Sequence, residues 1–99
     1  MHRRTKALQI SAKTKKIVYE RDGGLCIFCH RPGDPVAHVV ARSHGGLGIE
    51  QNIVTACLTC HTRLDNSTDR QIMLETAKRY LRAKYEDWKE EDCTYKKWG

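Results

Sequence analysis

Two Cys-x-x-Cys pairs constrain this chain more than any other feature. Cys26 and Cys29 form the first pair, Cys57 and Cys60 form the second, and the 27 residues 30–56 lie between them. Two residues between cysteines allow both sulfurs of a tight turn to face one ion, and structural zinc takes four such ligands in a tetrahedron. The insert exceeds the roughly 15 to 20 residues of the commonest double-knuckle zinc pattern. We therefore expect one Zn²⁺ ion bound by four thiolates, with a further site inside the insert.

A chain as short as this one benefits from a bound metal ion that stabilises its fold. The 99 residues are enough for one domain, and a domain this small buries a limited core. The five cysteines could instead form disulfides, but residues 1–16 are basic and polar and contain no apolar signal segment. We therefore expect a reducing, cytoplasmic environment, with Cys93 as a free thiol. No apolar run approaches the roughly 20 residues of a membrane span, so no membrane partner is expected.

The net charge of +6 is unevenly distributed. Residues 1–21 carry +6, residues 22–69 carry −2 and residues 70–99 carry +2. A basic flank beside a metal-rich centre favours a polyanionic partner that is held by its phosphates. The alternative is that these side chains only keep a small domain in solution. The excess in the N-terminal flank is concentrated in Arg3, Arg4, Lys6, Lys13, Lys15 and Lys16.

Hydrophobic spacing and turn residues predict a series of short elements. Residues 1–10 have few apolar anchors and are expected to form a flexible basic arm. Residues 11–22 predict a helix, with Ser11 as its N-cap and two glycines after its end. The remaining predicted elements are strands at 36–40 and 53–55, a short helix at 58–64 and an amphipathic helix at 68–88.

Two further local patterns carry predictions. Thr68 and Gln71 have the spacing of a capping box, which predicts that the last helix begins at Thr68. Gly45, Gly46 and Gly48 follow the first predicted strand and allow a close approach of another chain. We expect this glycine loop to face a substrate; the alternative is a plain connection without a task.

Several motifs in order closely resemble the HNH endonucleases, above all small phage members. The matching runs cover about half the chain and are Arg21-Asp22-Gly23-Gly24-Leu25-Cys26 with Cys29, Ala37-His38 through Gly45-Gly46, Asn52-Ile53-Val54, and Cys57-x-x-Cys60-His61. The resemblance implies an α+β fold: one domain over residues 1–99, with a zinc-stapled ββα-metal core at 26–66 and flanking N- and C-terminal helices. It also implies a metal-dependent endonuclease that nicks or cuts DNA.

The same resemblance implies a role for each motif residue. His38 is the first histidine of the motif and would act as the general base, since a neutral imidazole can accept a proton near pH 7. Asn52 would hydrogen-bond the loop backbone and orient His38. His61 would bind the catalytic ion, Mg²⁺ or Mn²⁺.

The ligand set departs from the family pattern at one position. Many members place an acidic residue or histidine directly before the base, but here that residue is Ala37, which cannot bind metal. Asp65 follows His61 by four residues, so on a helix both side chains share a face and can bind one ion. His44 is the other possible ligand, although we expect it to contact DNA, as Arg42 would through a phosphate.

Two rival functions use the same residues. One is a DNA-binding zinc module whose site is inactive because of Ala37, and the other is an interaction module that docks on a packaging enzyme. The phage resemblance suggests a terminase as partner and the bacterial host cytoplasm as location. We expect a monomer or weak dimer, while cleavage specificity, strand preference and the preferred catalytic metal remain open.

Overall fold

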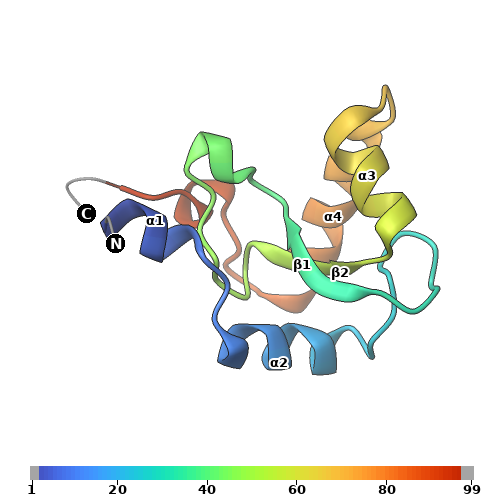
Figure 1. The fold of residues 1–99 in the computed structure, drawn as a ribbon, viewed down its shortest axis with the longest axis horizontal. Coiled ribbons are helices and arrows are strands. Elements are labelled where there is room, and N and C mark those ends of the chain that lie inside the picture. Colours follow the sequence, from blue (N-terminus) through green and yellow to red (C-terminus); the bar gives the residue numbers. More distant parts are fainter. Residues whose placement is uncertain (1–2, 97–99) are drawn as a thin grey trace.

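The computed structural model describes residues 3–96 of the chain, with side chains from residue 6 onward. A two-stranded antiparallel sheet lies between helices, and the chain order strand, loop, strand, helix is the one expected (Figure 1). The fold is therefore a small α+β domain. Its elements are α1 (Arg3–Leu8), α2 (Ala12–Arg21), β1 (Asp34–His38), the 3₁₀ turn η1 (Arg42–His44), β2 (Ile53–Ala56), α3 (Leu58–Asn66), α4 (Arg70–Lys84) and the 3₁₀ turn η2 (Glu90–Cys93).

The two strands pair so that His38 closes the first of them. His38 lies opposite Ile53 and Ala37 lies opposite Val54, with an irregularity in the register between Asp34 and Ala37. The strand predicted over 36–40 therefore begins and ends two residues earlier. Because β1 ends at His38, the imidazole lies at the end of the strand, where the next loop begins.

Alternate residues of β2 face different helices. Val54 and Ala56 belong to one buried apolar cluster with side chains of α3 and α4. Ile53 is fully buried too, but it must point to the opposite face because side chains alternate along a strand. On that face α2 runs along the hairpin (Figure 1) and buries Val18 completely. The cluster on the α3–α4 face comprises Cys26, Ala37, Val39, Val54, Ala56, Cys60, Leu64, Met73, Ala77 and Leu81.

A buried ion pair ties α2 to the rest of the fold. Arg21 and Asp22 are paired at 2.7 Å, with side-chain exposures of 11% and 0%. Arg21 donates to the carbonyl of Ile53, while Asp22 accepts from the backbone N–H of Thr55 and from the hydroxyl of Tyr80 on α4. Burial alone would raise the pKa of Asp22, but these hydrogen bonds hold it below its usual value. The network thus joins α2, β2 and α4.

The N-terminal segment is a helix, where a flexible arm was expected. Residues Arg3–Leu8 form α1, and Leu8 is only 4% exposed. One apolar anchor and one backbone hydrogen bond to the glycine loop hold this segment against the domain. Such tertiary contacts cannot be recognised from a stretch that is mostly polar.

The C-terminal helix α4 is shorter than predicted at both ends. It begins at Arg70 after Asp69, without a side-chain cap, so the expected capping box at Thr68 is wrong. It ends at Lys84, and Trp88 lies beyond it with its indole N–H donating to the carbonyl of Gln51 at 2.7 Å. None of the helices within residues 3–96 is both long and apolar enough to cross a membrane.

The glycine loop, residues 45–48, is internal, which contradicts the prediction that its glycines face a substrate. Gly45, Gly46 and Gly48 are all buried. A Cβ on Gly46 would lie 1.7 Å from the carbonyl oxygen of Val40, and one on Gly48 would lie 2.0 Å from that of Gln9. Real Cβ atoms do not approach other atoms so closely, so these glycines allow tight backbone packing.

Both ends of the chain pack against this loop. On the N-terminal side, the backbone N–H of Gly48 donates to Ala7 at 3.1 Å. On the C-terminal side, Leu47 donates to Cys93 at 2.8 Å, and Tyr95 donates to the carbonyl of Gly45 at 2.7 Å. The loop that follows His38 is therefore held from two sides.

Candidate functional site

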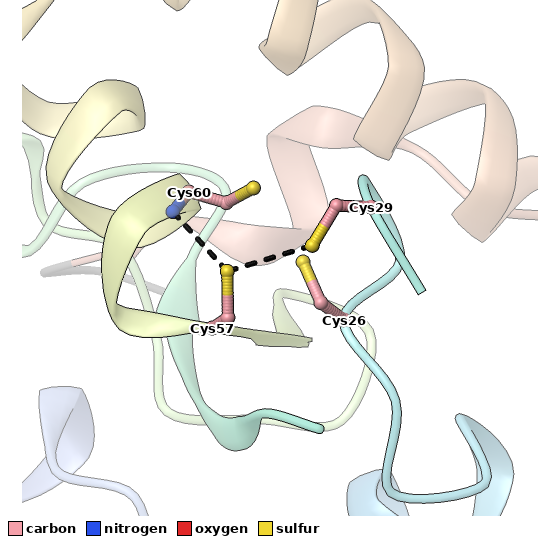
Figure 2. Close-up of side chains that lie close together, drawn as sticks. All are labelled: Cys26, Cys29, Cys57 and Cys60. Carbon is pink, nitrogen blue, oxygen red and sulfur yellow. Dashed lines mark hydrogen bonds between the residues drawn. The ribbon is translucent and has the colours of Figure 1, made fainter. Parts of the chain in front are cut away.

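The four paired cysteines converge as the sequence predicted. Their sulfur atoms all lie within 4.8 Å of one another, and the sulfurs of Cys29 and Cys57 are 3.5 Å apart. Figure 2 shows Cys26 and Cys29 facing Cys57 and Cys60. Sulfurs bound to one tetrahedral zinc at about 2.3 Å lie about 3.8 Å from each other. The four thiols, none of them in a disulfide, therefore fit one structural metal ion such as zinc.

Each knuckle is shaped by its own backbone hydrogen bonds. In the first, Cys26 donates to the carbonyl of Arg31 at 2.6 Å, and His30 adopts a left-handed φ of 66°. In the second, Cys57 precedes α3, and its sulfur accepts from the backbone N–H of Cys60. This hydrogen bond lowers the pKa of Cys57 to about 7, whereas burial raises the pKa of Cys60. A bound cation would favour the thiolate form at every position.

His38 lines a cavity of about 560 Å³, the site cavity, together with His61 and Asp65. Its Nε2 atom lies 3.0 Å from the carbonyl oxygen of Leu8. A carbonyl can only accept, so Nε2 carries the proton and the neutral ring keeps a lone pair on Nδ1. Burial lowers the pKa of His38; the Leu8 carbonyl opposes this effect and the positive charge of Arg42 adds to it.

Asn52 is fully buried and bridges the two ends of the loop after His38. Its Oδ1 accepts from the N–H of Val40 at 2.8 Å, and its Nδ2 donates to the carbonyl of Leu47 at 2.8 Å and to that of Val40 at 3.2 Å. The amide therefore holds the backbone two residues beyond the imidazole. Its expected role in orienting His38 stays a prediction.

His61 and Asp65 lie one turn apart on α3 and both line the site cavity. Their Nε2 and Oδ2 atoms are 3.7 Å apart, and the side chains are 32% and 62% exposed. Two ligands at about 2.1 Å from one cation lie about 3 to 4 Å apart. The pair therefore fits a shared hydrated cation.

Ala37 cannot contribute to that pair. It is fully buried in the apolar cluster. In the described part of the chain, the four cysteines are the one group of three or more His, Cys, Asp or Glu side chains arranged for a metal. A second ion in the site cavity would thus take two protein ligands, His61 and Asp65, and complete its shell with water or substrate oxygens.

Three cations from different elements line the site cavity: Lys15 of α2, Arg42 of η1 and Arg70 of α4. None of them forms an ion pair with a carboxylate among residues 6–96. Lys15 and Arg42 were among the expected DNA contacts, but Arg70 was not. No motif marks Arg70, because only the packing of α4 against α3 brings it to the cavity.

The other expected DNA contacts lie elsewhere. Lys6, Lys13 and Lys16 are exposed outside the site cavity, and His44 lines a neighbouring hollow. The side chains of Arg3 and Arg4 lie outside the described part of the chain. Sequence reasoning also missed the Leu8 carbonyl, since any residue type carries one.

A β-hairpin whose first strand ends in a histidine, followed by a helix that carries a second histidine lining the same cavity, is the arrangement of the ββα-metal class. Residues 26–67 match the family model of the HNH endonuclease, a span that runs from the first cysteine to the end of α3. This segment is therefore a nuclease-type domain of the HNH kind. No curated protein matches the chain.

Proposed function

We propose that the protein is a metal-dependent DNA endonuclease that hydrolyses phosphodiesters to nick or cut DNA. The observation that carries the proposal is the site cavity itself. It combines a half-buried imidazole, a histidine–aspartate pair that would bind a metal ion, and three cations without carboxylate partners among residues 6–96. Hydrolysis of a DNA phosphodiester needs a base that activates the attacking water and positive charge that stabilises the leaving oxygen. Binding of the DNA needs cations that contact its phosphates.

The base in this proposal is His38 acting through Nδ1. The Leu8 carbonyl holds the proton on Nε2, so the lone pair on Nδ1 is free to accept a proton from water. Burial lowers the pKa of His38 and thereby favours the neutral form at pH 7. Asn52 acts as a positioning residue, because it fixes the backbone that follows the base.

His61 and Asp65 would hold the catalytic ion, Mg²⁺ or Mn²⁺. When bound, a divalent cation supplies positive charge to the phosphate and to the leaving 3′ oxygen. An imidazole and a carboxylate, with the open cavity for water, suit a cation that keeps part of its hydration shell. The zinc at the four cysteines would have a structural role only, since four thiolates leave no open position.

DNA is the substrate that the charges favour. Lys15 and Arg42 would contact phosphates at the site cavity, and the exposed lysines of α1 and α2 would extend this contact. A terminase partner, a bacterial host cytoplasm and a monomeric or weakly dimeric state follow only from the phage resemblance, and we carry them as part of the proposal.

One observation favours a second candidate, a zinc-containing DNA-binding module without catalysis. Ala37 has no side-chain atom that could bind a metal, so the ion in the site cavity would have two protein ligands, His61 and Asp65. Two ligands bind a divalent cation weakly unless substrate oxygens join them. This candidate predicts DNA binding with the same salt dependence but no cleavage at any Mn²⁺ concentration.

Supercoiled plasmid distinguishes the two candidates. Zinc-loaded protein is incubated with plasmid with and without added Mn²⁺, which avoids a chelator that would also remove zinc. The endonuclease proposal predicts conversion to nicked or linear plasmid that saturates with Mn²⁺. Plasmid that is bound but stays supercoiled throughout the titration would contradict it in favour of the inactive module.

A further inference from the structure

A second hollow adjoins the site cavity and has no assigned task. This hollow, the side groove, measures about 320 Å³ and shares Val39, Ala41, Arg70 and Leu74 with the site cavity. The two hollows therefore adjoin, and the Arg70 side chain lies at their common border. The side groove is lined by Val39, Val40, Ala41, His44, Arg70, Leu74, Lys78, Glu90 and Thr94.

One side of the side groove is formed by a single face of α4. Arg70, Leu74 and Lys78 follow each other at intervals of four residues, so their side chains share one face of the helix. Eight residues of helix span about 12 Å, which corresponds to about three nucleotide steps of one strand measured along the axis of B-DNA at about 3.4 Å each. The opposite side carries His44 of η1. The groove is thus long enough for a short stretch of phosphate backbone.

The charges differ between the two ends of the side groove. At the site end, Arg70 is half-buried and has no ion-pair partner among residues 6–96. At the far end, Lys78 is 15% exposed and pairs with Glu90 at 2.7 Å. Glu90 lies on η2 and is itself 53% exposed, so this carboxylate can move into solvent. Arg70 can therefore bind a phosphate directly, whereas at Lys78 a phosphate must first displace the carboxylate of Glu90.

We propose that the side groove binds the phosphate backbone of the DNA strand on one side of the scissile bond. Arg70 provides the first phosphate contact and Lys78 the next, with Glu90 weakening the second contact by competing for Lys78. The inference rests on the proposed nuclease function and adds the path of the substrate strand. A guanidinium suits this role because its planar fork of donors matches two phosphate oxygens.

Arg70→Gln tests the proposal, with Arg79→Gln as its matched control. Both changes remove one positive charge from α4, but Arg79 is exposed and lines neither cavity. Arg70→Gln should raise KM for plasmid about tenfold with kcat unchanged, as expected for loss of a charge-assisted contact made equally in the ground and transition states. The slope of log affinity against log salt should fall in magnitude by about 0.9. Arg79→Gln should change KM less than twofold.

Glu90→Gln is an independent test, because it should change KM in the opposite direction from Arg70→Gln. Loss of this carboxylate frees Lys78, so KM should fall about threefold. Two sets of duplexes share one cleavage position; one set is shortened on its 5′ side and the other on its 3′ side. They show whether the DNA on the 5′ or the 3′ side of the scissile bond lies in the side groove. The effect of Arg70→Gln should disappear when one flank is shortened and persist when the other is.

The outcomes separate this inference from the proposed function. Wild-type protein that neither binds nor cleaves DNA would overturn both. Wild-type protein that cleaves, with equal KM values for Arg70→Gln and Arg79→Gln at unchanged melting temperature, would overturn the side groove alone. An unchanged KM for Glu90→Gln would contradict the contact at Lys78.

Discussion

The site depends on atoms that a motif does not describe. His38 is recognisable from the sequence, but its Nε2 proton is held by the carbonyl of Leu8, thirty positions earlier. Any residue at position 8 would supply a carbonyl, so this partner could not be predicted. Arg70 escaped prediction for a related reason, since it is an ordinary first-turn residue until α4 packs beside α3.

The residues that could be predicted are those whose spacing fixes their geometry. Cys-x-x-Cys pairs must form knuckles, and the four sulfurs meet as expected. Asp65 was predicted to share a helix face with His61, and both lie on α3 with their side chains 3.7 Å apart. Their part in binding a catalytic ion remains a prediction.

Asp65→Ala tests the ligand pair most sharply. The change leaves His61 as the one protein ligand, so the Mn²⁺ concentration for half-maximal cleavage should rise by about 10- to 100-fold. Asp87→Ala, at an exposed aspartate outside the site cavity, is the control. Plasmid cleavage across a Mn²⁺ titration provides the measurement. A titration curve for Asp65→Ala that coincides with the wild-type curve would show that the ion is bound elsewhere.

At the scale of elements, prediction succeeded where local signals are strong. Ser11 caps α2 through its hydroxyl, which accepts from the N–H of Thr14 at 3.1 Å, and the β-branched run at Ile53 forms β2. Prediction failed for α1, because its sequence is mostly polar and the helix packs against the domain through one buried side chain, Leu8. It also failed for the glycine loop, because glycine allows either close packing or exposure, and only the fold decides between them.

Gly48 connects the glycine loop to the segment that carries the Leu8 carbonyl. In Gly48→Ala the new Cβ would lie 2.0 Å from the backbone oxygen of Gln9, so residues 7–9 must move. A displacement of about 1 Å at a catalytic group can cost about 10²-fold in rate. We expect cleavage to fall by about this factor while zinc content is unchanged.

The control for this variant is Ser43→Ala, at an exposed position of the neighbouring turn η1. Single-turnover plasmid nicking, measured beside zinc content, distinguishes the two variants. If Gly48→Ala nicks as fast as Ser43→Ala, the N-terminal segment does not position the base.

At the scale of the whole molecule, zinc is expected to hold the fold. Apparent binding free energies of structural zinc sites reach about 10 kcal/mol or more, comparable to the whole stability of a small domain. Cys57→Ser should therefore lose the ion and the cooperative thermal transition. Cys93→Ser, at a buried thiol outside the cluster, should keep one zinc ion per chain. Metal analysis and thermal melting check both outcomes; a Cys57→Ser protein that melts as the wild type does would refute the structural role.

The separation of the two metal sites gives the central claim its test. We propose that the four cysteines stabilise the fold and that the site cavity carries the chemistry, so removal of the base should leave the folded, DNA-binding protein intact. General-base catalysis contributes typically 10²- to 10⁴-fold.

The most direct measurement is the single-turnover rate of plasmid nicking in Mn²⁺ by His38→Ala, beside its zinc content and its affinity for DNA. The account predicts a rate at least about 10²-fold below that of the wild type, with zinc content and affinity retained. Nicking by His38→Ala at the wild-type rate would contradict it.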